Sequence, residues 1–330
     1  IFHYYLCRRL KGGGMEIKMK KIAFVFPGQG AQYIGMGKDF YEQIPECREV
    51  FEEASKATGL DLPSLCFEEN EALDITEYTQ IAMLTVEAAI LRALQKKGIS
   101  SNVNAGLSLG EYGALIASGV LSFFDAFQIV RQRGILMQKA VPHGGAMTAV
   151  MGLDEKKIKE ICEKTEGIVS IANYNCPGQT VITGEETAVN RASEELKKSG
   201  ARRCIPLKVS GPFHSKMLEN AGRDLRKVLE KVEIHQIKIP YITNVTAEYV
   251  TDKNMVKTLL EQQVYSSVLW QQSVERMIKD GVDIFIEIGP GKTLSSFLKK
   301  IDRTVTGINV EKVEDLEKVM AALQQEECLC

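Results

Sequence analysis

The chain of 330 residues lacks the features that mark several large classes of protein. No apolar run approaches the ~20 residues that a membrane-spanning helix needs, so we expect no membrane partner. Charge of neither sign dominates, because 41 Lys and Arg residues nearly balance 43 Asp and Glu residues. Such a balance gives no overall attraction to nucleic acid or to an anionic membrane surface. We therefore expect neither as a partner.

Cysteine and histidine patterns are equally sparse. The eight cysteines contain no CxxC pair, and the four histidines show no spacing typical of metal ligands. These absences predict a reduced, cytoplasmic protein that binds no metal.

The hydrophobic residues, 45% of the chain, are enough for a sizeable core. Residues 1–14 place their basic residues after the apolar ones, the reverse of a secretory signal, and Met15 is a more natural start. We therefore expect residues 1–14 to lie outside the fold.

Strand-like and helix-like segments alternate through 15–144 and again through 210–330, with helical periodicity over 79–97 and 124–140. This alternation is typical of a mostly parallel sheet covered on both faces. Residues 145–209 instead read strand, helix, strand, strand, helix, strand, which is the ferredoxin-like order. The sequence thus predicts an α/β fold in which 15–144 and 210–330 form the larger domain and 145–209 an inserted smaller one.

Residues 106–110 read GLSLG and match the pattern G-x-S-x-G. In that pattern the glycines permit a sharp strand-to-helix turn that exposes the serine hydroxyl and directs backbone N–H groups toward an oxyanion. The same short pattern also recurs by chance, and its polar lead-in SNVNA is unusual for a buried strand. The motif alone leaves Ser108 either a nucleophile or an ordinary serine at a strand end.

A serine nucleophile needs a base, so the histidines are the next candidates. His214 follows Gly211 and Pro212 in a loop before a helix, a position where catalytic groups are common. His143 has a comparable context, whereas His235 lies in a polar run and His3 in the first 14 residues. Without a partner, a structural role remains the commoner one for any of them.

Two stretches resemble nucleotide-binding loops, but each has a different residue at one position where the motif requires glycine. The run IEIGPGKTL has Ile286 where a P-loop needs glycine. The run GQGAQY has Tyr33 at the third glycine of a dinucleotide fingerprint. We therefore reject both nucleotide-binding interpretations.

Six stretches taken in order resemble the malonyl-CoA:acyl carrier protein transacylases and the related acyltransferase domains of polyketide synthases. They are FPGQGAQ (26–32), GLSLGEY (106–112), RQRGILMQ (131–138), NYNCPGQTVI (173–182), GPFHS (211–215) and EIGPGKTL (287–294). The resemblance covers nearly the whole chain after Met15, and the length favours a free-standing enzyme of fatty-acid synthesis.

This resemblance implies an α/β-hydrolase-like larger domain with a ferredoxin-like insert and an active site between the two. It implies that Ser108 takes the malonyl group from malonyl-CoA as an ester and passes it to the phosphopantetheine thiol of holo-acyl carrier protein. The reaction would be ping-pong, with the CoA thioester as substrate and no cofactor.

The resemblance also implies roles for single residues. His214 would be the base, oriented by a backbone carbonyl near Gln263 in place of an acidic residue. The N–H groups of Gln29 and Leu109 would form the oxyanion hole. Arg133 would hold the free malonyl carboxylate, since its planar fork binds both oxygens.

Further pocket positions follow from the same resemblance. Phe213 would narrow the pocket against a methyl branch, and Met137, Asn173 and Asn175 would line it. The family usually has histidine where this chain has Leu107, which we expect to change the polarity of the pocket without abolishing catalysis.

Proteins with other functions share some of these motifs. A serine hydrolase such as a thioesterase or lipase has the same serine turn, although Arg133 and the GPFHS context argue against it. A polyketide pathway and a non-catalytic carrier-binding subunit are further alternatives. Because carrier proteins are acidic, we name four basic residues as docking candidates: Arg202, Arg203, Lys299 and Lys300.

Overall fold

The computed structural model describes residues 6–11 and 14–328, and its centre is a six-stranded sheet with the strand order β10-β9-β4-β3-β11-β12. All neighbouring strands are parallel except β9 and β10. The strands are β3 (Lys21–Phe26), β4 (Val103–Gly106), β9 (Tyr241–Ile242), β10 (Tyr249–Val250), β11 (Val282–Ile288) and β12 (Thr306–Val310). The predicted α/β fold with a mostly parallel sheet is confirmed.

Strand β3 shows why this sheet is buried on both sides. Its sequence is apolar from Ile22 to Phe26, and every one of those residues is buried. Successive side chains of a strand point to opposite faces, so Phe24 and Phe26 enter one core cluster while Ala23 and Val25 enter another. A continuous apolar run is what a parallel strand covered on both faces requires.

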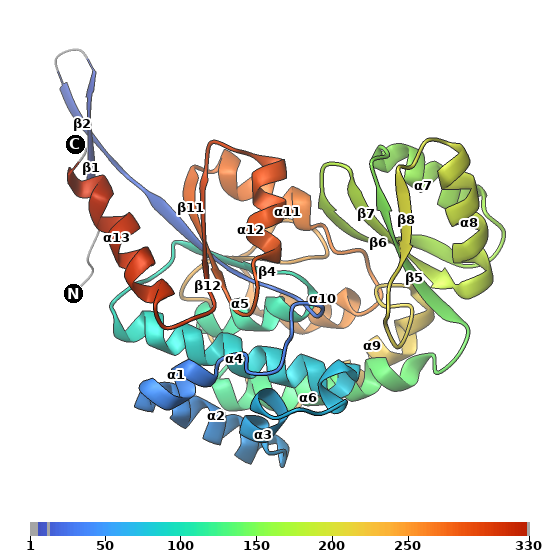
Figure 1. Ribbon diagram of the computed structural model, residues 1–330, viewed down its shortest axis with the longest axis horizontal. Coiled ribbons are helices and arrows are strands. Elements are labelled where there is room, and N and C mark those ends of the chain that lie inside the picture. Colours follow the sequence, from blue (N-terminus) through green and yellow to red (C-terminus); the bar gives the residue numbers. More distant parts are fainter. Residues whose placement is uncertain (1–5, 12–13, 329–330) are drawn as a thin grey trace.

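Helices cover the two faces of the sheet (Figure 1). One face packs against α4 (Thr76–Lys96) and α5 (Glu111–Ala117), and α2 (Pro45–Thr58) and α6 (Phe123–Ala140) pack on α4 as a further layer. The other face packs against α11 (Trp270–Lys279) and α12 (Thr293–Ile301). The other α-helices outside 145–209 are α1 (Lys38–Gln43), α3 (Leu62–Phe67), α9 (Glu219–Leu229), α10 (Val256–Gln263) and α13 (Asp315–Cys328).

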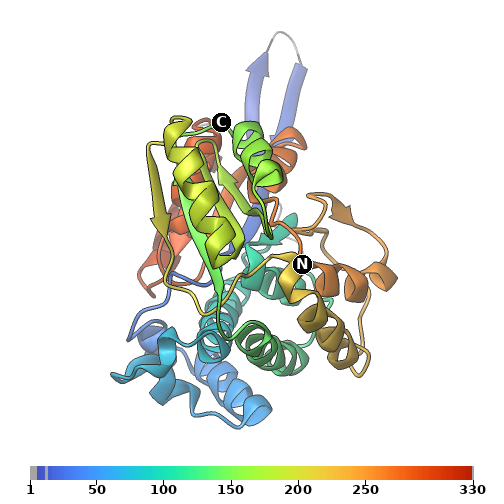
Figure 2. The ribbon, with the colours of Figure 1, turned by 90° about the vertical axis from the view of Figure 1, so that its right-hand side faces the viewer.

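A second sheet is antiparallel, with the order β6-β7-β5-β8. Along the chain its elements are β5 (Gly145–Met151), α7 (Glu155–Lys164), β6 (Val169–Cys176), β7 (Gln179–Glu185), α8 (Glu186–Lys198) and β8 (Arg203–Pro206). Figures 1 and 2 show α7 and α8 on the face of this sheet that is turned away from the larger sheet. Backbone hydrogen bonds between Val268 and residues 172 and 174 join the two parts of the molecule.

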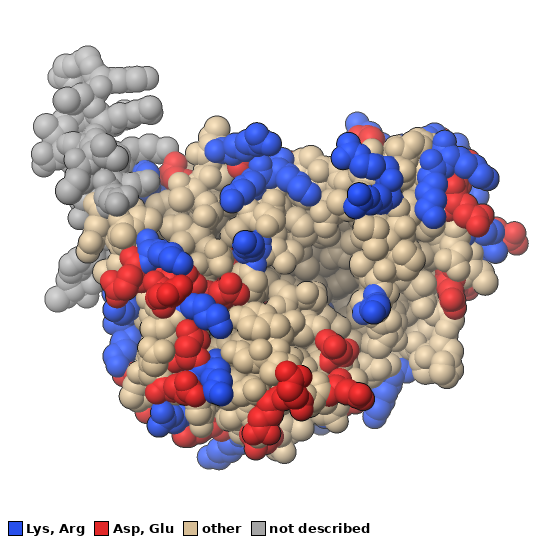
Figure 3. Space-filling model, viewed as in Figure 1, with Lys and Arg blue, Asp and Glu red and all other residues tan. Residues whose placement is uncertain are grey.

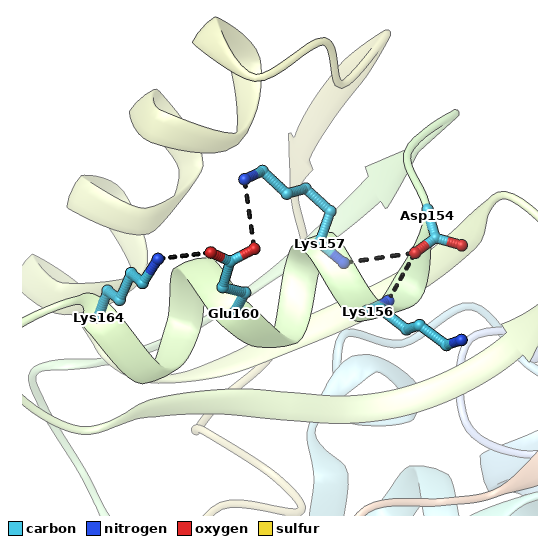
Figure 4. Close-up of polar contacts among 5 residues, drawn as sticks. All are labelled: Asp154, Lys156, Lys157, Glu160 and Lys164. Atoms are coloured by element: carbon cyan, nitrogen blue, oxygen red, sulfur yellow. Dashed lines mark hydrogen bonds and ion pairs between the residues drawn. The ribbon is translucent and has the colours of Figure 1, made fainter.

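Helix α7 shows how local sequence sets an element boundary (Figure 4). The Asp154 side chain accepts hydrogen bonds from the backbone N–H groups of Lys156 and Lys157 and so caps the helix. Glu160 pairs with Lys157 and Lys164 along the exposed side. Such exposed pairs contribute little, so the buried face of α7 anchors the helix to the sheet.

Residues at the start of the chain form a separate two-stranded sheet. Strand β1 (Leu6–Lys11) pairs antiparallel with β2 (Gly14–Met19), and neither strand pairs with the larger sheets. Figure 1 shows this hairpin projecting beyond them, with β1 beside α13. We expected residues 1–14 to lie outside the fold. Within that range, residues 6–11 form β1, which belongs to neither of the two main sheets, and residues 1–5 and 12–13 are outside the described part.

Candidate active site

Ser108 lies on a sharp turn between β4 and α5. Its φ is +53°, in the left-handed region that residues other than glycine rarely adopt. The turn also requires glycine at its far end, because a Cβ on Gly110 would lie 2.1 Å from the carbonyl oxygen of Phe26. The backbone therefore forms a strained strand-to-helix turn of the kind that a G-x-S-x-G pattern predicts.

His214 lies beside this serine. Its Nε2 is 2.8 Å from Ser108 Oγ, and its Nδ1 is 2.8 Å from the backbone oxygen of Gln263. Since a carbonyl oxygen only accepts, Nδ1 carries the proton and Nε2 is free to accept the serine hydroxyl. Of the other histidines, His143 is exposed and His235 lies near Glu233, while His3 is outside the described residues.

The environment of His214 keeps its imidazole neutral. Burial, followed by the positive charge of Arg133, lowers the pKa of His214 to about 4. The hydrogen bond to Gln263 acts in the opposite direction without restoring the ordinary value. At neutral pH the ring is therefore in the form that accepts a proton.

Arg133, on α6, is a buried cation at the same place, with 1% of its surface exposed. Its Nη1 donates to Gln80 Oε1 at 2.7 Å, and its Nη2 donates to Gln263 Oε1 at 3.0 Å and to Ser108 Oγ at 3.1 Å. All three acceptors are neutral. Among the described residues no carboxylate forms an ion pair with Arg133, and its Nε has no hydrogen-bond partner. A buried guanidinium without an ionised partner favours the binding of an anion.

A cavity of about 370 Å³ opens in front of these groups. Its lining comes from both sheets, with Met147 and Ala149 on β5 and Val181 on β7 opposite Ser108 and His214. Figure 3 shows the surface hollowed between the two parts of the molecule. The pocket positions named from the sequence all line it: Phe213, Met137, Asn173 and Asn175.

Gln29 and Leu109 face the same cavity from two segments. Leu109 follows the serine in the turn, and Gln29 lies in the loop after β3. Gly28 lets this loop approach the turn, since a Cβ there would be 2.7 Å from the carbonyl oxygen of Leu107. The two backbone N–H groups are thus on segments that border the nucleophile.

Sequence reasoning missed two polar residues that brace the turn. Asn244 accepts a hydrogen bond from Ser108 N at 2.6 Å and donates to Gly106 O at 2.6 Å. Glu111, fully buried, accepts from Gln263 Nε2 at 2.7 Å and from Asn244 N at 3.1 Å. The sequence contained a clue to each residue. Glu111 is a charged residue at the start of an apolar helix, and Asn244 is a polar residue just after the carboxyl end of a buried strand, where functional residues are common.

The four basic docking candidates are exposed. Lys300 donates to Gln179, which lines the cavity, so Lys300 is at its rim. Among the described residues, no group of three or more His, Cys, Asp or Glu is arranged to hold a metal ion. No helix in that same part of the chain is both long and apolar enough to cross a membrane.

Fold and site together define an acyl transferase, and the acyl transferase domain family matches residues 23–321. A Bacillus subtilis protein named malonyl CoA-acyl carrier protein transacylase is 46% identical over 93% of this chain and 99% of its own. A transacylase structure of that name from Clostridium perfringens superimposes with a TM-score of 0.91 at 46% identity, covering 94% of this chain and 99% of its own. A malonyl-transacylase solved in complex with its type II polyketide acyl carrier protein has a TM-score of 0.89 at 39% identity, covering 93% and 100%. The chain belongs to the malonyl CoA-acyl carrier protein transacylase family.

Proposed function

We propose that this protein transfers the malonyl group from malonyl-CoA to the phosphopantetheine thiol of holo-acyl carrier protein, and so supplies fatty-acid chain extension in the cytoplasm. The observation that carries this proposal is the buried Arg133, whose guanidinium is 3.1 Å from Ser108 Oγ and has no carboxylate partner among the described residues. An acyl group on that oxygen would present its own far end to the guanidinium. Only an acyl group ending in an anion pairs with it.

In the first half-reaction His214 Nε2 takes the proton of Ser108 Oγ while the oxygen attacks the thioester carbonyl carbon. The negative charge that develops on the carbonyl oxygen is held by the N–H groups of Gln29 and Leu109. The C–S bond then breaks, and the protonated His214 returns the proton to the CoA sulfur. The product is a malonyl ester of Ser108.

The second half-reaction reverses these steps with a different thiol. His214 takes the proton from the carrier's phosphopantetheine thiol, and the sulfur attacks the malonyl ester. The C–O bond breaks, Ser108 regains the proton, and the malonyl group leaves on the carrier. CoA departs before the carrier reacts, so the mechanism is ping-pong and uses no cofactor beyond the thioester itself.

We also propose how the fold is divided. The larger domain, 15–144 and 210–330, is α/β-hydrolase-like, and the smaller, 145–209, is a ferredoxin-like insert. The element order β5-α7-β6-β7-α8-β8 supports the second assignment. The cavity between the sheets then lies at the domain boundary, where binding sites are common.

The carrier protein approaches this boundary. We propose that its acidic surface meets the exposed basic residues Arg202, Arg203, Lys299 and Lys300, of which Lys300 lies at the rim of the cavity. Rim charges of this kind act mainly on the rate of encounter.

Intact-mass analysis after mixing with malonyl-CoA tests the proposal. The parent should gain one malonyl group, and holo-acyl carrier protein should then remove it faster than water does. Ser108→Ala should gain none; a malonyl adduct on this variant would remove Ser108 from the mechanism. Rapid loss of the adduct to water, with no transfer to the carrier, would instead assign a serine hydrolase.

A further inference from the structure

Glu111 is a buried acid that the proposed mechanism does not use. It opens α5, three residues after the nucleophile, and is fully buried. Its Oε2 accepts hydrogen bonds from Gln263 Nε2 at 2.7 Å and from Asn244 N at 3.1 Å. No Lys, Arg or His within the described part of the chain forms an ion pair with it.

The Gln263 side chain connects this acid to the guanidinium. Its amide nitrogen donates to Glu111, and its amide oxygen accepts from Arg133 Nη2 at 3.0 Å. The amide dipole is therefore oriented with its positive end toward the anion and its negative end toward the cation. Away from water such a chain of hydrogen bonds is polarised along its length and strengthened. Glu111 is thus coupled to Arg133 through Gln263, in a site where no carboxylate among the described residues accepts a hydrogen bond from that cation directly.

We propose that Glu111 is a positioning residue that supplies the internal counter-charge of Arg133 and competes with the substrate carboxylate for that cation. This inference rests on the proposed function. The ionised carboxylate stabilises the guanidinium in the empty site and opposes the second negative charge that malonyl brings. Glu111 thereby limits how tightly the acyl group is held, which favours its release to the carrier.

The charge of Glu111 changes in an accessible pH range. Burial raises its pKa to about 7, while hydrogen bonds from Gln263 and Asn244, a nearby Thr243 hydroxyl and the charge of Arg133 act in the lowering direction. Glu111 is therefore mostly neutral at pH 6 and mostly ionised at pH 8.

Four charged or titratable neighbours keep their charge state over the same range, whereas Glu87 on α4, which lies against Gly113 on the helix of Glu111, has a pKa that burial raises well above its ordinary value. Burial raises the pKa of Tyr112, on the same helix, and of Tyr241, on β9, above their ordinary values, so both phenols stay neutral. His214 has a pKa of about 4 and is neutral throughout. Arg133 stays charged. A pH effect on malonyl binding between pH 6 and 8 that is present in the parent and absent in Glu111→Gln therefore reports on Glu111.

The test is an equilibrium measurement, which does not depend on how fast a variant reacts. The enzyme is incubated with fixed ratios of malonyl-CoA to CoA until the adduct fraction, read by intact mass, stops changing. The same is done with acetyl-CoA, whose acyl group carries no charge. The ratio of the malonyl to the acetyl equilibrium constant cancels the titration of the CoA thiol and isolates the carboxylate.

For the parent this ratio should fall by at least about threefold from pH 6 to pH 8, because an ionised Glu111 repels the malonyl carboxylate. In Glu111→Gln the amide oxygen can accept from Gln263 and Asn244 as before, and only the charge is lost. Its ratio should be flat with pH and should exceed that of the parent at pH 8 by the same factor. The matched control is Glu77→Gln, which removes the acid paired with Arg131 at 3.0 Å and should leave the ratio and its pH dependence as in the parent.

Each outcome is decisive. A flat ratio in the parent overturns the inference whether or not Glu111→Gln folds, and so does a Glu111→Gln ratio that still falls with pH. A purely structural role for Glu111 would lower the adduct fraction for both acyl groups alike. Absence of any malonyl adduct on the parent would instead refute the proposed function.

Discussion

Replacing Arg133 with methionine is the most direct test of how this site selects its acyl group. Methionine keeps much of the volume and removes the charge. In the proposed acyl-enzyme of the parent, the malonyl carboxylate is desolvated against a guanidinium that is 1% exposed. Removing one partner of a buried ion pair costs about 3–5 kcal/mol, because the other charge is left without compensation. Each 1.36 kcal/mol is about a factor of ten in rate, so kcat/KM for malonyl-CoA should fall by at least about a hundredfold.

The assay is the single-turnover rate of acylation, measured with malonyl-CoA and acetyl-CoA in parallel. Acetyl presents no carboxylate, so Arg133→Met should reduce its acylation rate at least about tenfold less than that of malonyl, and the loss that remains reflects the hydrogen bond from Arg133 to Ser108 Oγ. Arg133→Lys should give an intermediate loss with malonyl-CoA, since a lysine keeps the charge and loses the fork. The matched control is Arg131→Met on the same helix, which removes the partner of Glu77 and should leave both rates near those of the parent.

The reasoning fails if both substrates lose rate equally in Arg133→Met. That result would mean that Arg133 supports the turn or the base rather than the carboxylate. An equal loss in Arg131→Met would point to damage of α6 as a whole.

Two further predictions concern the base and the brace of the turn. The kcat/KM for acylation by malonyl-CoA, which reports the free enzyme, should fall on acidification only around pH 4, because the proposed base His214 must be neutral and its pKa is lowered to about 4. Rapid-quench measurements at low malonyl-CoA across pH 3.5–8 would contradict this with an acid limb near the ordinary histidine value of about 6.5. Asn244→Ala removes the hydrogen bonds to Ser108 N and Gly106 O, so we expect the free energy of unfolding to fall by about 2–4 kcal/mol and acylation to slow at least about tenfold. Denaturant unfolding of the variant at the stability of the parent would show that Asn244 does not brace the turn.

Much of the fold could be predicted because it depends on local patterns. The periodicity over 79–97 and 124–140 corresponds to α4 at Thr76–Lys96 and α6 at Phe123–Ala140. Just beyond the end of α4, Gly98 has a φ of +76°, which glycine adopts without strain and which makes glycine a common residue at a helix end. The apolar run before Pro27 forms β3, and its lack of alternation is typical of a strand covered on both faces. Local periodicity also predicted the order strand, helix, strand, strand, helix, strand over 145–209, which corresponds to β5, α7, β6, β7, α8 and β8.

The site was predictable where a residue carries its own local signal or belongs to a motif. Ser108 is flanked by glycines in a recognisable motif, and His214 lies in a loop that Gly211 and Pro212 impose. Arg133 was identified only through the resemblance to the transacylase family. Glu111 was passed over although it is in the same quoted stretch as Ser108, because an acid at a helix start is ordinary on a surface. Its burial, which makes it unusual, is a property of the packed molecule.

The sequence by itself determined the elements and the chemical groups available: a serine on a glycine-flanked turn, few histidines and an arginine in a helix. Only the tertiary structure decided that Arg133, His214 and Gln263, which lie 25, 106 and 155 positions from Ser108, meet around its hydroxyl and backbone. It also decided that the guanidinium is desolvated and coupled through Gln263 to a buried acid. The physical reason is that strand order and the packing of helices on a sheet bring distant segments together, and burial then sets the charge of each group, whereas local periodicity records neither.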